Sequence, residues 1–305
     1  MPLLKIGTRG SPLALAQARE ARARLMAAHG FAEDEIAIVA ITTTGDRIRD
    51  RPLTEIGGKS LFTKEIEEAL LAKDIDFAVH SMKDMPARLP EGLVISTFLP
   101  REDAREAFLS PIATTLAELP QGSTVGSSSV RRTAQVLRLR PDIKTVLFRG
   151  NVETRLRKLA DGAAHATFLA AAGLNRLGLA DRIASLVPMD VMLPAVAQGA
   201  IGIEIRENDA ATRSLLAAIN HRDTEIAVSC ERAFLAALDG SCRTPLAGHA
   251  MLRNSVLRFR GHALTLDGVH CFETIQEGSP ADAERMGREA GEEVKARGGA
   301  LIAFS

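Results

Sequence analysis

The chain has 305 residues, 46% of them hydrophobic and 25% charged, a composition that excludes disordered and fibrous proteins. Lysine plus arginine and aspartate plus glutamate both number 38, so the formal net charge is zero, which excludes coating of nucleic acid through a general basic excess. No apolar run approaches the roughly 20 residues of a membrane-spanning helix, so we expect no membrane partner.

The first hundred residues alternate between strand and helix patterns. Residues 3–9 indicate a strand, and Ser11 followed by Pro12 is typical of the start of a helix, which ends near Gly30. The sequence then predicts a buried strand at 35–42, a polar loop at 43–58, a helix at 62–70 and a further strand at 75–79. This alternation predicts a parallel or mixed sheet with helices on both faces.

A polar segment near residue 100 indicates a crossing into a second α/β set. That set is predicted to hold strands near 123–127, 143–149 and 164–171 and helices near 130–140 and 151–160. A return crossing over 188–194 leads to an apolar strand at 200–206, expected to rejoin the first sheet, and a helix over 208–219. Beyond 222, a long helix, alternating strands over 247–276 and a helix from about Ser279 indicate a small α+β domain.

Charged and hydroxyl side chains follow the first predicted strands. In open α/β sheets, ligands bind at the carboxyl ends of strands beside helix N-termini. Arg9 and Ser11 follow the first strand, and Ser81, Lys83 and Asp84 follow the strand at 75–79. The first group indicates an anion site, or a surface arginine beside a helix cap. In the second group, Lys83 indicates an anion site and Asp84 a positioned acid or base, and a solvated turn is the alternative.

Arginines recur at the strand ends of the second set. Arg131 and Arg132 open a predicted helix, where the helix dipole disfavours cations unless an anionic ligand binds there. Arg149, Arg155 and Arg176 follow later strands. The 30 arginines against eight lysines are consistent with a GC-rich genome, but their placement favours a ligand with several carboxylates or phosphates.

The three cysteines form neither a disulfide framework nor a metal pair, and none of the seven histidines has metal-ligand spacing, so we expect no metal. Cys230 lies on an apolar helical stripe and Cys271 among alternating strand residues, so both are predicted to be structural. Cys242 follows a helix end beside Arg243, which favours the thiolate; an idle loop thiol is the alternative.

Eight segments, in order along the chain, resemble the porphobilinogen deaminase (hydroxymethylbilane synthase) family. They are IGTRGSPLALAQ (6–17), GGKSLFTKE (57–65), AVHSMKDMP (78–86), GSSSVRR (126–132), RGNVETR (149–155), LAAAGLNRLG (169–178), PAVAQGA (194–200) and DGSCRTP (239–245). Together they span roughly residues 4–250. Small residues depart from the family pattern at Ser60, Ala104, Ala197 and Ser241, which affects loop conformation rather than the expected chemistry.

The resemblance implies two α/β lobes like those of periplasmic binding proteins, around a cleft, plus a small C-terminal α+β domain. Its domains are expected at 1–99 with 200–219, at 100–199 and at 220–305. It implies a transferase that joins four porphobilinogen molecules head to tail into hydroxymethylbilane, releasing ammonia, on a covalent dipyrromethane primer. These products belong to porphyrin, tetrapyrrole and heme biosynthesis.

The resemblance also assigns roles to residues of this chain. Cys242 is expected to carry the dipyrromethane through a thioether, and Asp84 to be the catalytic carboxylate. The residues expected to bind the cofactor are Lys83, Ser81, Ser129, Arg131, Arg132 and Arg155. Those expected to bind substrate are Arg9, Ser11, Lys59, Arg149, Arg176 and Gln198.

The expected mechanism joins these residues to the arginine pattern. Porphobilinogen loses ammonia to give an electrophilic azafulvene, which the free α-carbon of the terminal pyrrole attacks. Asp84 stabilises the positive charge near the pyrrole N–H groups and assists proton transfer. After four rounds, water releases the product and the primer stays on Cys242. Acetate and propionate groups on every ring explain why arginines gather in one cleft.

Two alternatives belong to other classes. Two α/β lobes also describe a non-enzymatic solute- or anion-binding module, but such proteins are usually exported and the start of this chain has no signal-peptide core. A regulatory effector-binding domain is the other, but no helix-turn-helix segment precedes the lobes. We therefore expect a cytoplasmic, monomeric enzyme with a small-molecule substrate and no nucleic-acid partner.

Overall fold

The computed structural model describes residues 2–47, 62–239 and 244–302. The chain divides into two compact units. One takes in the described residues of Met1–Arg49, Gly58–Glu102 and Gly199–Glu225, and the other those of Asp103–Gln198 and Ile226–Ser305. The expected division into three domains, with the C-terminal part on its own, stays a prediction.

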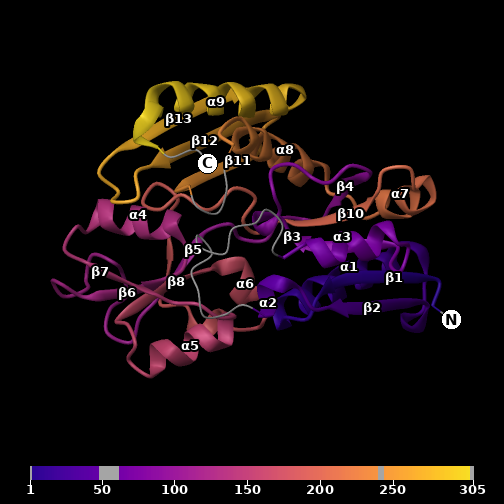
Figure 1. Ribbon diagram of the computed structural model, residues 1–305, viewed down its shortest axis with the longest axis horizontal. Helices are drawn as coiled ribbons and strands as arrows, with labels where there is room; N and C mark the ends of the chain where they lie inside the picture. The colour runs from indigo at the N-terminus through magenta and orange to yellow at the C-terminus, as the bar shows by residue number, and fades with distance from the viewer. Residues whose placement is uncertain (1, 48–61, 240–243, 303–305) are drawn as a thin grey trace. The chain divides into compact units, whose positions relative to one another are not determined.

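The first unit is a five-stranded mixed sheet in the order β2-β1-β3-β10-β4 (Figure 1). The strands are β1 (Leu4–Arg9), β2 (Ile36–Ile41), β3 (Phe77–Ser81), β4 (Leu93–Phe98) and β10 (Ile201–Arg206). β1 is parallel to both β2 and β3, whereas β10 is antiparallel to β3 and β4. The prediction that residues 200–206 rejoin the first sheet is therefore confirmed.

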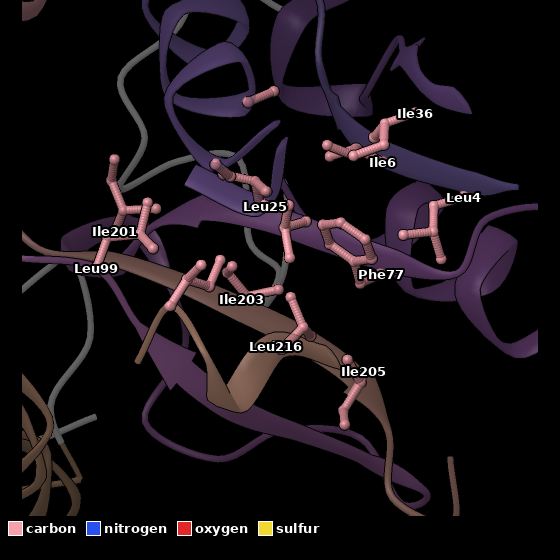
Figure 2. Packing of buried hydrophobic residues seen from close by; sticks show 14 residues of the cluster. Leu4, Ile6, Leu25, Ile36, Phe77, Leu99, Ile201, Ile203, Ile205 and Leu216 are labelled. Atoms are coloured by element: carbon pink, nitrogen blue, oxygen red, sulfur yellow. The ribbon is translucent and has the colours of Figure 1, made fainter. Parts of the chain in front are cut away.

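Helices cover both faces of this sheet. The unit's helices are α1 (Pro12–His29), α2 (Thr44–Arg47), α3 (Lys64–Leu71) and α7 (Ala210–Ala217). Figure 2 shows Leu25 of α1 and Leu216 of α7 packed with Phe77 and Ile203 on one face. On the other face, Ile66 and Leu70 of α3 pack with Ala78 and neighbours. Alternation along β3 and β10 thus turns one set of side chains to α1 and the other to α3.

Local signals fix the ends of α1 as predicted. The Ser11 side chain accepts a hydrogen bond from the backbone N–H of Ala14, Pro12 occupies the first turn, and Gly30 ends the helix with φ 74°. The prediction that the strand at 35–42 is buried is wrong. β2 is an edge strand and most of its residues are only partly buried, because β1 is its single neighbour.

Two other expectations in the first hundred residues need correction. The predicted loop from residue 43 begins instead with the short helix α2, while residues 48–58 lie outside the described part of the chain. The sequence patterns also gave no strand at 93–98, where β4 pairs with β10.

The second unit contains a sheet with the same plan, in the order β7-β6-β8-β5-β9. Its strands are β5 (Glu106–Leu109), β6 (Thr124–Ser127), β7 (Lys144–Leu147), β8 (Ala166–Ala170) and β9 (Ser185–Val187), with helices α4 (Val130–Leu139), α5 (Val152–Ala160) and α6 (Ala171–Arg176). β6 is parallel to β7 and β8, whereas β5 is antiparallel to β8 and β9. The sequence patterns did not predict β5 and β9, which fall in or beside the expected crossings.

The C-terminal part of the second unit is an antiparallel sheet of β11 (Leu246–Arg253), β12 (Val256–Leu264) and β13 (Cys271–Gly278). The helix α9 (Ala283–Gly298) packs on this sheet (Figure 1). The helix α8 (Arg222–Ala237) supplies Phe234, whose ring lies 5.0 Å from that of Phe259. The small α+β architecture predicted beyond residue 222 is confirmed.

Glu231 of α8 joins this part to the end of the return crossing. Its buried carboxylate accepts hydrogen bonds from the backbone N–H groups of Ala197 and Ala250. Ala197 has φ 59°, the left-handed region that glycine adopts without strain. One of the small-residue departures from the family pattern thus occupies a strained backbone position, held by a buried carboxylate.

Close packing of α9 on α8 gives a stability prediction. A Cβ added at Gly287 would lie 2.0 Å from the backbone oxygen of Cys230, which cannot move without displacing α8. We expect Gly287→Ala to lower the free energy of unfolding by about 1–3 kcal/mol in urea titrations. Glu292→Ala, at an exposed position on the same helix, is the control and should change it little. Equal stability of the two variants would contradict this close contact.

Candidate functional site

A pocket opens at the carboxyl ends of β1 and β3 in the first unit. Four residues expected at the site line it, namely Arg9, Ser11, Ser81 and Asp84. They come from separate stretches of the chain, and the parallel pairing of β1 with β3 brings these stretches to one edge of the sheet. The pocket therefore combines a cation, two hydroxyl groups and a carboxylate.

Packing fixes the polar groups of this pocket. The guanidinium carbon of Arg9 lies 4.3 Å from the centre of the Phe62 ring, a cation–π contact. Gln17 of α1 is buried, and its Nε2 donates to Ser81 Oγ at 2.7 Å. The serine hydroxyl is thus oriented by an amide that the sequence reasoning did not assign to the site.

Asp84 ends a short 3₁₀ turn, Met82–Asp84, that follows β3. Met82 is buried and its backbone N–H donates to the oxygen of Ala200, which anchors the turn to the sheet. Asp84 itself is exposed and lines the pocket, while Lys83 is half-buried. An anchored turn with an exposed carboxylate suits a group that must meet a ligand.

A buried ionisable cluster adjoins this pocket, and the sequence reasoning missed it. His80 Nε2 lies 2.9 Å from Glu204 Oε2, with the two side chains 5% and 0% exposed. Glu67 of α3 is also buried. Burial raises the pKa of Glu67, and the nearby charge of Glu204 raises it further. A glutamate inside the apolar run 200–206 was the signal in the sequence.

In the second unit, Arg131 and Arg132 converge on a buried carboxylate. Glu106 of β5 accepts from Arg131 Nη2 at 2.6 Å and from Arg132 Nε and Nη2 at 3.0 and 2.7 Å. All three side chains are buried, and Arg131 also donates to the oxygen of Leu193. The two arginines at the start of α4, which were expected to need an anionic ligand, thus have Glu106 as an anion within the protein. The three side chains together keep a net charge of plus one. Their expected role in cofactor binding stays a prediction.

Gln198 belongs to the same buried group. Its side chain is fully buried, and its Nε2 donates to the oxygen of Ala104 at 2.8 Å and to Glu106 Oε1 at 3.1 Å. It therefore joins the two crossing segments within the second unit. The expected contact between Gln198 and substrate stays a prediction.

The other residues expected at the site lie on loops and helix ends of the second unit. Ser129 caps α4 by accepting from the backbone N–H of Arg132, and Arg155 Nε donates to the oxygen of Gly150 at 2.8 Å. Arg149 precedes α5, and Arg176 ends α6. Lys59 and Cys242, with Ser60 and Ser241, lie outside the described residues.

The buried ion pairs predict a large stability effect. Glu106→Ala leaves two buried guanidinium groups without their carboxylate, and loss of one partner of a buried pair typically costs about 3–5 kcal/mol. We expect an unfolding free energy lower by about that amount in urea titrations. Asp181→Ala, which removes an exposed carboxylate in the same unit, is the control. A similar stability for both variants would show that Glu106 is not needed to balance the arginines.

Within the described residues, no helix is long and apolar enough to cross a membrane. Over the same residues, no group of three or more His, Cys, Asp or Glu side chains is arranged to hold a metal ion.

Comparisons with known proteins cover nearly the whole chain. Residues 4–214 match the family model described as "Porphobilinogen deaminase, dipyromethane cofactor binding domain", and residues 225–296 match "Porphobilinogen deaminase, C-terminal domain". Porphobilinogen deaminase of Paracoccus denitrificans is 60% identical over 294 residues, 96% of this chain and 94% of that protein. The Nitrobacter hamburgensis protein of the same name is 56% identical over 97% of this chain and 94% of its own length.

Solved structures of lower similarity were also found. The methionine-binding protein MetQ is 16% identical, with a TM-score of 0.44, covering 71% of this chain and 89% of its own.

Proposed function

This chain belongs to the porphobilinogen deaminase family, and we propose on that basis that it joins four porphobilinogen molecules head to tail into hydroxymethylbilane, releasing ammonia. It is a transferase of tetrapyrrole and heme biosynthesis with a dipyrromethane cofactor. The observation that carries this function is the match of a deaminase cofactor-binding domain over residues 4–214, which include the pocket at the ends of β1 and β3. Nothing favours the alternative of a non-enzymatic binding module.

The chemistry of the pocket fits a dipyrromethane and its substrate. Pyrrole rings offer N–H donors and carry acetate and propionate acceptors. Asp84 supplies an acceptor for N–H groups, while Arg9, Ser11 and Ser81 supply donors for carboxylates. When bound, the cofactor supplies the nucleophilic ring carbon to which the first substrate is joined.

The roles proposed for individual residues follow from these donors and acceptors. Asp84 holds the pyrrole N–H groups and stabilises the positive charge that develops on them. Cys242 anchors the cofactor. Donors to the cofactor are Lys83, Ser81, Ser129, Arg131, Arg132 and Arg155, and donors to the substrate are Arg9, Ser11, Lys59, Arg149, Arg176 and Gln198. The net positive charge around Glu106 supports the part given to Arg131 and Arg132.

We further propose that the enzyme works in the cytoplasm as a monomer, without a nucleic-acid partner. The zero net charge supports the last point, because it offers no general attraction to phosphate backbones.

The reaction itself provides the test. The purified protein is incubated with porphobilinogen, and the consumption of substrate, the release of ammonia and the mass of the product are measured. We expect one ammonia for each porphobilinogen consumed and a linear tetrapyrrole as product. Substrate that remains unconsumed, or a product of fewer than four rings, would contradict the proposed function.

A further inference from the structure

The two ring nitrogens of His80 have different surroundings. Nε2 lies within the protein, 2.9 Å from Glu204 Oε2, on the α3 face of the sheet. Nδ1 makes no hydrogen bond to any described residue. It is also not among the described side-chain nitrogen and oxygen atoms that are buried without a hydrogen-bond partner. His80 is also one of the residues that line the pocket with Ser81 and Asp84.

The buried carboxylates determine which nitrogen carries the proton. Glu204 is fully buried, and its Oε1 has no hydrogen-bond partner among the described residues, so the contact of its Oε2 with His80 Nε2 is the hydrogen bond that this carboxyl group makes there. Burial raises the pKa of Glu67, the other carboxyl of this cluster, and so favours its neutral form. An ionised Glu204 accepts the N–H of Nε2, and Nδ1 is then the unprotonated acceptor.

We propose that His80, oriented by Glu204, is a second catalytic residue of the pocket that accepts a proton at Nδ1 during each addition. The proposal rests on the proposed function. Each addition breaks the bond between the substrate's methylene carbon and its ammonium nitrogen and forms a carbon–carbon bond to the accepting pyrrole. The pyrrole carbon then loses its proton to Nδ1. The imidazolium passes this proton to the released ammonia, which leaves as ammonium, and His80 is neutral again.

The charges around His80 suit this cycle. Glu204 on β10 contacts the imidazole, and Asp84 after β3 and Arg9 on β1 line the same pocket as His80. Glu67 on α3 faces the same buried cluster. The imidazole therefore has a carboxylate on its buried side and a charged pocket on the other, the arrangement of an oriented general base.

His80→Gln removes the proposed proton acceptor but can keep the hydrogen bond to Glu204. The glutamine Nε2 can still donate to Glu204, but the side chain offers no titrating nitrogen to the pocket. We expect kcat to fall by about 10²-fold with KM nearly unchanged, and the pH profile of kcat to differ from that of the wild-type protein. The covalent adduct, measured as intact mass after long incubation with porphobilinogen, should remain. His29→Gln, at an exposed histidine of the same unit, should behave as wild type.

Glu204→Gln is the second variant, and it tests the proposed role of His80 if His80→Gln does not fold. A neutral amide no longer fixes the tautomer, so we expect a similar fall in kcat with the adduct retained. His80→Gln with kcat within twofold of wild type and an unchanged pH profile would show that the pair is only structural, as would a fully active Glu204→Gln. A wild-type protein that neither carries an adduct nor consumes porphobilinogen would instead overturn the proposed function.

Discussion

Cys242→Ala should carry no covalent adduct and should consume no porphobilinogen. A thioether requires a sulfur nucleophile, and alanine has none. In the wild-type protein, two porphobilinogen units less two ammonias add about 420 Da, which intact-mass spectrometry resolves. Without a primer fixed to the chain, the first addition has no anchored acceptor. We therefore expect turnover to be lost completely.

The other two cysteines provide the controls for this experiment. Burial raises the pKa of the Cys230 thiol to about 12 and also raises the pKa of Cys271, so neither is prone to form a thiolate at neutral pH. Cys271→Ala should keep the full adduct and its activity. An adduct that persists in Cys242→Ala, or one that is lost in Cys271→Ala, would place the attachment on another residue.

Local sequence signals predicted most of the elements, because they depend on neighbours along the chain. Ser11, Pro12 and Gly30 set the limits of α1, and the apolar run at 200–206 predicted a strand of the first sheet. The strands that were missed depend on distant partners. β5 has four residues and pairs with segments some 60 to 80 residues further on, so its short sequence carries little evidence of the pairing. The exposure of β2 likewise depends on its place at the sheet edge.

The candidate site divides in the same way. Residues at the ends of β1 and β3 were each predicted as candidate site residues. The structure places them at one pocket, because parallel strands bring their carboxyl ends to one edge. The partners of buried charges were not predictable. Glu106 lies on a strand that was not foreseen, 25 residues before Arg131, and Glu204 lies 124 residues after His80. Only the folded chain shows which side chain each buried carboxyl group contacts.

Asp84→Asn should keep the covalent adduct yet lose nearly all turnover. Asparagine has almost the same size and leaves one oxygen acceptor for a pyrrole N–H, but it cannot balance a positive charge or accept a proton. Removal of such a group from a site typically lowers kcat by about 10²–10⁴-fold. Since Asp84 is exposed and its turn is anchored through Met82, we expect no change in stability. Intact mass, urea unfolding and steady-state kinetics measure these three properties on one preparation.

A matched carboxylate separates this effect from a general change of charge. Asp74 is exposed in the same unit and comes before β3, at the opposite end of that strand from the pocket. Asp74→Asn removes the same charge and should leave kcat unchanged. Activity of Asp84→Asn close to that of Asp74→Asn would remove Asp84 from the mechanism. Loss of the adduct in Asp84→Asn would show that its carboxylate already acts when the primer is assembled, because the primer is itself made by joining two porphobilinogen units.

Because Asp84 and His80 line one pocket, we expect their effects on kcat to be coupled. If both groups serve the same proton transfer, Asp84→Asn combined with His80→Gln should lower kcat by less than the product of the two single effects.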